Sequence, residues 1–184
     1  MRKVLKQRWS LEEIFSGGSE SSEFKQFLLK LEGDISKEAA ITIEMKELKS
    51  ISGNDEWIEQ MNRIQELSAR LLEATHFVGC LESENVEDEK AIILSGKVRD
   101  ISSQFEIVIN DFEQTLVHIP DDIWAQLLQL EQIKPIAYPL QEKREKAKGT
   151  LPVAQEKLIH DLSINGYHAW VNLYNSVTGK TKIV

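Results

Sequence analysis

The stretch WIEQMNRIQELSARLLEATHFVGCL, residues 57–81, carries the pattern that decides the fold. Its apolar residues recur in steps of three and four, which places them along one face of an α-helix. The positions on this face are Trp57, Met61, Ile64, Leu67, Leu71, Ala74, Val78 and Leu81. A helix with one long apolar face must pack against a partner, so this stretch predicts a bundle of helices.

A second run of the same kind follows after a short polar segment. Its positions are Ala91, Leu94, Val98, Ile101, Phe105, Val108, Phe112 and Thr115. Two long helices joined by a short connection are antiparallel neighbours, and such pairs cross at about 20°. We therefore predict that the segments 57–81 and 91–115 pack against each other as the centre of the fold.

The rest of the chain predicts further helices separated by Gly and Pro. Ser10 and Glu13 match a capping box that starts a short helix, and Gly17-Gly18 ends it. We predict an all-α antiparallel bundle of about six to seven helices, two of them long, with no significant sheet. Within one helical domain, 1–184, the predicted ranges are 1–18 for the capped helix, 21–51 for a whole or broken helix, 54–83 and 85–118 for the long pair, and 121–133, 136–148, 151–164 and 167–177 for shorter helices.

The charge of the chain limits its partners. The formal net charge is -8, whereas nucleic acids and anionic membranes are bound by faces rich in Lys and Arg. The one basic run, 143–148, is interrupted by an acid and is typical of a solvated helix C-terminus. No apolar run approaches the roughly 20 residues that cross a bilayer. We expect neither nucleic acid nor a membrane as a partner.

The single cysteine indicates the compartment. One thiol cannot form an intrachain disulfide, and the basic N-terminus lacks the apolar core of a signal peptide, so we expect a cytoplasmic protein. Cys80 lies among Phe77, Val78 and Leu81 with no cation beside it, which predicts a buried, inert thiol.

The C-terminal segment is dense in aromatic residues. Tyr167, Trp170, Val171 and Tyr174 are spaced i, i+3, i+4 and i+7, so they share one face of a helix. This face must be covered either by the upstream helices or by a part of a larger protein. We predict that Trp170 is mostly buried within this chain and that Tyr174 and later residues are exposed.

The sequence contains no recognisable catalytic machinery. A zinc hydrolase helix needs the pattern H-E-x-x-H, and none of the four histidines begins it. Glu156 and His160 are i, i+4 neighbours, and His168 could join them in a weak alternative metal cluster; a surface hydrogen bond or ion pair is the ordinary interpretation. We predict no catalytic residue, no metal ligand and no cofactor in this chain.

Three stretches, taken in order, resemble the oligoendopeptidase F family of thimet-type zinc metallopeptidases. The first is 9–18, followed by Phe24, Phe27 and Leu28. The second is Cys80-Leu81 with the acidic segment through Ala91. The third joins Glu156-Lys157-Leu158-Ile159 and Leu162 to Gly166-Tyr167-His168-Ala169-Trp170 and Leu173-Tyr174.

The resemblance implies the N-terminal domain of a peptidase that cleaves oligopeptides with a zinc-bound water. The zinc site of that family would lie in a later catalytic domain, so none of its catalytic or metal-binding residues is carried over to this chain. The implied interface with the missing catalytic domain includes Tyr167, Trp170 and Tyr174. Exposed apolar surface could also favour self-association. The alternative is a free-standing, non-enzymatic helical module that binds partner helices.

Overall fold

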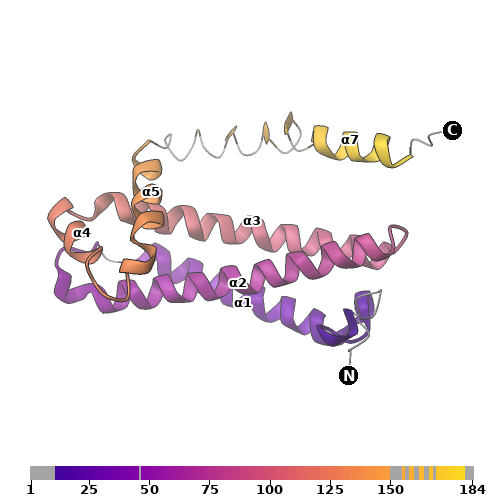
Figure 1. Cartoon of the computed structure of the whole chain (residues 1–184), viewed down its shortest axis with the longest axis horizontal. Coiled ribbons are helices and arrows are strands. Elements are labelled where there is room, and N and C mark those ends of the chain that lie inside the picture. The colour runs from indigo at the N-terminus through magenta and orange to yellow at the C-terminus, as the bar shows by residue number, and fades with distance from the viewer. Residues whose placement is uncertain are drawn as a thin grey trace, which may run out of the picture.

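The computed structural model describes residues 11–45, 47–149, 155, 158–159, 162–163, 166–167 and 169–180. Figure 1 shows three long helices side by side: α1 (Ser22–Glu44), α2 (Asn54–Glu84) and α3 (Glu89–His118). Each runs antiparallel to the next one along the chain. The described residues form α- and 3₁₀-helices and no strand, so the all-α prediction is confirmed.

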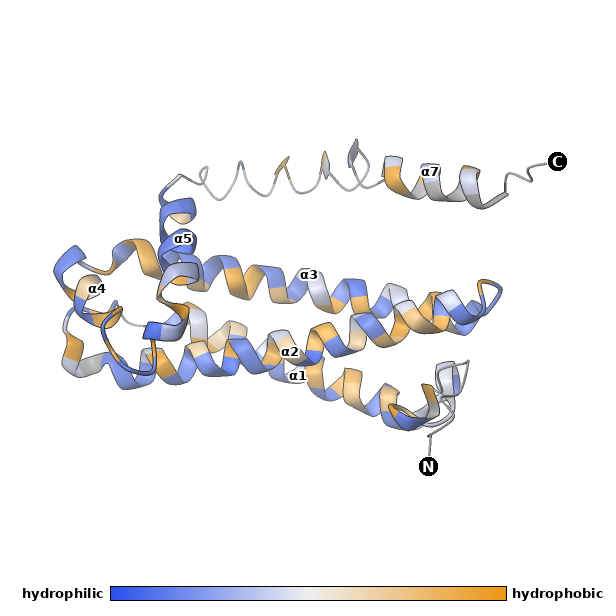
Figure 2. Ribbon diagram, in the orientation of Figure 1, coloured by the Kyte–Doolittle hydropathy of each residue, from blue (hydrophilic) through white to orange (hydrophobic). Residues whose placement is uncertain are grey.

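The helices α2 and α3 are the two long runs read from the sequence. Their periodic apolar positions are buried except Leu71 and Thr115, which are half-buried. Figure 2 shows hydrophobic and hydrophilic residues alternating along both helices, as expected of amphipathic helices. A short turn, 85–88, joins the two helices. The Asp88 carboxylate closes this turn, because it accepts hydrogen bonds from the backbone N–H groups of Lys90 at 2.9 Å and Ala91 at 3.1 Å.

The helix α1 runs unbroken through Gly33. The sequence analysis had allowed either one whole helix or a helix broken at this glycine. One glycine in a helix interior costs about 1 kcal/mol, which the buried residues on both sides outweigh. The hydroxyl of Ser21 caps the start by accepting from the Phe24 N–H at 3.2 Å. The helix ends at Glu44, before the predicted limit of 51, and a short 3₁₀-helix, η3 (Ile51–Gly53), leads into α2.

The N-terminal end of α1 is covered by a reversing segment. Its 3₁₀-helices are η1 (Leu11–Glu13) and η2 (Gly18–Glu20). Gly17, just before η2, and Gly18, its first residue, have φ values of 93° and 56°. These left-handed conformations suit glycine, as the sequence predicted. They turn the chain so that Phe15 packs on Phe24 and Phe77, with ring centroids 5.0 and 4.9 Å apart. The predicted capping residue, Ser10, lies outside the described residues.

The opposite end of the bundle is covered by α4 (Asp121–Leu127), η4 (Lys134–Ile136) and α5 (Ala137–Lys148). The prediction of one helix over 121–133 was wrong, because α4 ends at Leu127. Leu127 and Ile133 are both fully buried. Residues six apart point in different directions on an α-helix, so the turn at 128–133 is what allows both side chains to reach the core.

The last described helix, α7 (Ala169–Lys180), stands apart from the bundle in Figure 1. It corresponds to the predicted range 167–177, with Tyr167 just before its first residue. Most of the predicted range 151–164 lies outside the described residues. Among the described helices, none combines the length and the apolar character that a membrane crossing requires.

Candidate functional site

Arg144 joins α5 to the end of α3. Its side chain is only 4% exposed. Its Nε donates to the backbone carbonyl of Leu116 at 2.9 Å, and its Nη2 donates to the carbonyl of Ile119. The carbonyls at the C-terminus of a helix lack intrahelical partners and carry partial negative charge. A guanidinium supplies both the missing hydrogen-bond donors and a compensating positive charge.

The same guanidinium also contacts α4. Its Nη1 lies 3.0 Å from Asp121 Oδ1, and its central carbon lies 4.8 Å from the Trp124 ring centroid. The Trp124 indole N–H in turn donates to Gln141 Oε1 of α5 at 2.6 Å. These contacts hold α5 against α4 and the end of α3.

The basic run 143–148 was predicted to be a solvated helix end, and this prediction was wrong for Arg144. The neighbouring Lys143 and Lys146 are exposed, as expected. The missed signal is the helical spacing of Leu140, Arg144 and Ala147, which are all buried on one face of α5. An arginine in phase with apolar residues can be a buried anchor whose charge is met by carbonyl groups.

The aromatic residues of the C-terminal segment are exposed. Tyr167, Trp170 and Tyr174 have exposed fractions of 73%, 69% and 68%. Val171, Leu173 and Val177 are also exposed. The prediction that Trp170 is mostly buried within this chain was therefore wrong. The upstream helices bury their apolar faces against one another, and the hydrophobic core of the described residues contains no residue of α7.

The other predicted site residues were metal ligands or thiols. Glu156, His160 and His168 lie outside the described residues, so the alternative metal cluster stays a prediction. In the described part of the chain, no three His, Cys, Asp or Glu side chains gather to hold a metal ion. Cys80 is exposed, which corrects the prediction of a buried thiol. Its neighbours Phe77 and Val78 take the core-facing positions of α2, and Cys80 points outward.

The α1–α2 interface contains paired charges that the apolar pattern did not predict. Arg63 Nε donates to the buried Glu38 carboxylate at 2.8 Å, and this hydrogen bond raises the pKa of Arg63. Arg70 Nη1 donates to Asp34 Oδ2 at 2.9 Å, and this bond lowers the pKa of Asp34. The pairs satisfy charges that helix packing removes from water, which is a structural role.

Comparison with known proteins finds a similarity to a protein family in the C-terminal part of the chain. The family model described as oligopeptidase F, for the N-terminal region of M3 peptidases, matches residues 115–182. No curated protein and no solved structure matches the chain. The resemblances noted at 9–28 and 80–91 lie outside the matched residues and stay predictions.

The matched residues comprise the last turn of α3 and the segments that follow it. They begin at Thr115, near the end of α3, and include α4, α5 with its Arg144 anchor, and α7 with its exposed aromatic residues. The match covers about a third of the chain and includes the third of the three stretches read from the sequence. Over residues 115–182 this chain is therefore similar to the N-terminal region of the oligopeptidase F family, as the sequence resemblance implied.

Proposed function

We propose that this chain is the N-terminal helical domain of a cytoplasmic, zinc-dependent oligopeptidase. In this proposal the chain shapes the route to the active site, and a separate catalytic region supplies the zinc ligands and cleaves short peptides. The observation that carries the proposal is the position of α7. This helix lies within the residues similar to oligopeptidase F and exposes an apolar side-chain set.

The occupant of the α7 face would be the catalytic region. Large exposed apolar patches are unusual on monomeric proteins and commonly mark contacts with other chains or domains. Trp and Tyr are also the residue types that contribute most to binding energy at such contacts. In this proposal the zinc ligands belong to the catalytic region and not to this chain.

The experiment compares the 184-residue chain with the longer protein that joins it to a catalytic region. Each is incubated with a quenched fluorescent oligopeptide and zinc. We expect turnover only from the longer protein, and we expect a chelator to abolish it. Chelator-sensitive turnover by the 184-residue chain alone would overturn the proposed division of labour.

A pair of variants in the longer protein tests the role of α7. Trp170→Glu places a charge on the proposed contact, and Tyr138→Glu places one on a similarly exposed aromatic of α5. Loss of an aromatic anchor at an interface costs about 2 kcal/mol or more, so we expect Trp170→Glu to lower kcat/KM by roughly 30-fold. If both variants were as active as the parent protein, the proposed contact between α7 and the catalytic region would be refuted.

A further inference from the structure

The outward side of α1 carries apolar side chains that the described part of the bundle leaves uncovered. Leu29 is 65% exposed and Ile43 is 75% exposed. Between them Gly33, Ser36 and Ala40 are also exposed, and a Cβ added at Gly33 would meet nothing within 4 Å. These residues follow one another in steps of three and four, so they form one continuous face, which we call the outer face of α1. Single exposed apolar residues are ordinary, but a continuous face with large apolar side chains at both ends suits a helical partner.

The residues of the outer face are arranged symmetrically along the helix. Leu29 and Ile43 lie equally far from Ser36, one on each side of it. A two-fold axis at Ser36 that relates two antiparallel copies of α1 brings Leu29 of each copy against Ile43 of the other. Gly33 and Ala40 then lie opposite each other, and their small size lets the two helices approach closely. The outer face is therefore complementary to itself in an antiparallel arrangement.

The charges beside the outer face follow the same symmetry. Lys30 and Glu44 flank the face on the same side, and neither has an ion pair in the described part of the chain. In the antiparallel arrangement Lys30 of each copy lies beside Glu44 of the other, which makes two ion pairs between the copies. Lys37 lies near its own copy at the axis, but Asp34 of the same helix already pairs with it at 3.3 Å. A parallel arrangement would place like charges side by side, so the charges select the antiparallel one.

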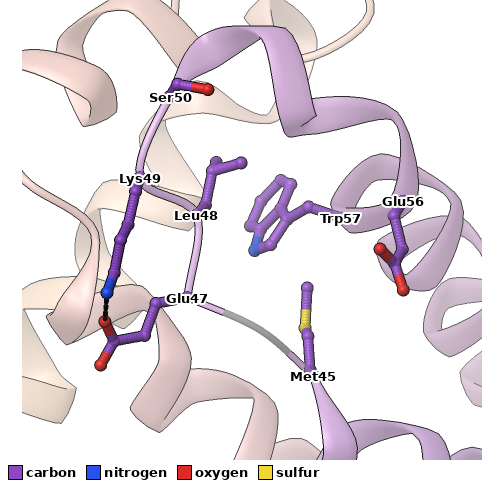
Figure 3. A pocket seen from close by; sticks show the side chains of 7 residues that line it. All are labelled: Met45, Glu47, Leu48, Lys49, Ser50, Glu56 and Trp57. Carbon is purple, nitrogen blue, oxygen red and sulfur yellow. Dashed lines mark ion pairs between the residues drawn. The ribbon is translucent and has the colours of Figure 1, made fainter.

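The corner beyond α1 bounds the outer face (Figure 3). There the chain turns toward α2 around a pocket of about 270 Å³, and the buried Leu48 and Trp57 belong to its lining. The next acid along the chain, Glu47, is already engaged by Lys49, with their charged atoms 3.1 Å apart. Glu44 is therefore the acid that remains for a lysine of a second copy at this end of the face.

We propose that the outer face of α1 is a dimer interface for a second copy of this chain, packed antiparallel about a two-fold axis at Ser36. Few large apolar side chains meet in this contact, so we expect a weak dimer with a Kd of roughly 0.1 mM. In Figure 1 α3 lies between α7 and α1, so this interface leaves the aromatic residues of α7 free. The proposal rests on α1 alone and is independent of any peptidase activity.

The experiment measures self-association of the 184-residue chain by sedimentation equilibrium. All samples carry Trp170→Glu and Tyr174→Glu, so that contacts through the exposed face of α7 do not contribute. We expect Lys30→Glu to weaken the dimer by about five- to tenfold, because it replaces two ion pairs with two like-charge contacts. Adding Glu44→Lys to this variant should restore the parent Kd to within about twofold. Lys146→Glu, an exposed change on α5 with the same effect on net charge, should leave the Kd unchanged.

Cross-linking tests the antiparallel register. In a Cys80→Ser chain, Leu29→Cys and Ile43→Cys are made separately and treated with a short bis-maleimide. We expect a cross-linked dimer when the two variants are mixed and little from either alone, because identical positions lie about 20 Å apart along the helices. A chain that stays monomeric at about ten times the expected Kd overturns the proposal, and so does a charge exchange that fails to restore association. Efficient cross-linking of Leu29→Cys to itself would show a parallel contact and would also overturn it.

Discussion

Replacement of Arg144 by methionine is expected to destabilise the end of the bundle strongly. Methionine has a similar length and fits the apolar surroundings, but it cannot donate to the carbonyls of Leu116 and Ile119. Each hydrogen bond from a charged group contributes about 1.5–3 kcal/mol. The stacking on Trp124 adds about 1 kcal/mol, and the ion pair with the exposed Asp121 adds little.

The buried guanidinium also loses its own hydration, and this cost offsets part of these gains. We therefore expect Arg144→Met to lower the free energy of unfolding by about 3 kcal/mol. Arg144→Lys should lower it by about half as much, because an ammonium keeps the charge but cannot span both carbonyls. The exposed Arg99, which donates a hydrogen bond to Ser95 in the same helix, provides a control, and Arg99→Met should change stability by less than about 0.5 kcal/mol.

Urea unfolding followed by circular dichroism measures the global effect. Hydrogen exchange of the α5 amides measures the local one, because α5 could open before the three long helices. Arg144→Met should increase exchange in α5 more than in the middle of α2. A methionine variant within about 0.5 kcal/mol of the parent, with unchanged exchange in α5, would refute the anchoring role.

Three further results are expected. Gly33→Ala should stabilise the chain by about 0.5–1 kcal/mol in urea unfolding, because an added Cβ meets open space in α1. Gly17→Ala should destabilise it by about 1 kcal/mol, because Gly17 has a φ of +93°. Changes of the opposite sign would contradict the backbone conformations of these two glycines. The hydrogen bond from Arg70 holds the pKa of Asp34 below its usual value, so the contribution of Asp34 to stability is present at neutral pH and is lost as the pH falls below about 4. Asp34→Asn should therefore reduce the decrease of the urea unfolding midpoint with falling pH in that range. An unchanged decrease would contradict this role of Asp34. Trp170→Glu combined with Tyr174→Glu should change the free energy of unfolding by less than about 0.5 kcal/mol, because both side chains are exposed. The same double variant should reduce any self-association seen by sedimentation velocity. A large loss of stability would show that α7 packs on the bundle.

The long helices were predictable because their signal repeats many times. The spacing from Trp57 to Leu81 allows one helical face and no regular alternative, and the second run supplies its partner. The sequence around Gly33 did not decide whether the α1 region forms one helix or two, because the answer depends on how deeply the residues on both sides of the glycine are buried. The length of α4 depends on where Ile133 finds space in the core, and the local sequence does not encode that.

The candidate site was less predictable, because its features depend on contacts between distant segments. Arg144 looks like one cation in a basic run, and only the arrival of α5 at the end of α3 makes it an anchor. The pocket beside Trp57 arises where the chain turns between α1 and α2. The aromatic spacing around Trp170 correctly indicated a helix, but it contained no information on the distance between that helix and the bundle.

Four ion pairs between the α1 region and its neighbouring helices have the same polarity. Glu20, Glu32, Asp34 and Glu38 supply the acids from α1 or the turn before it, and Lys90, Lys97, Arg70 and Arg63 supply the bases from α2 and α3. Apolar faces that repeat every three or four residues would tolerate a slip of one helical turn. The charges would not, because a slip would leave the buried Glu38 carboxylate without its hydrogen bonds from Arg63, a loss of about 1–3 kcal/mol given that the Arg63 side chain is 39% exposed. The pairs thus specify the register of α1, and exchanging Glu38 and Arg63 would preserve that register while reversing its polarity.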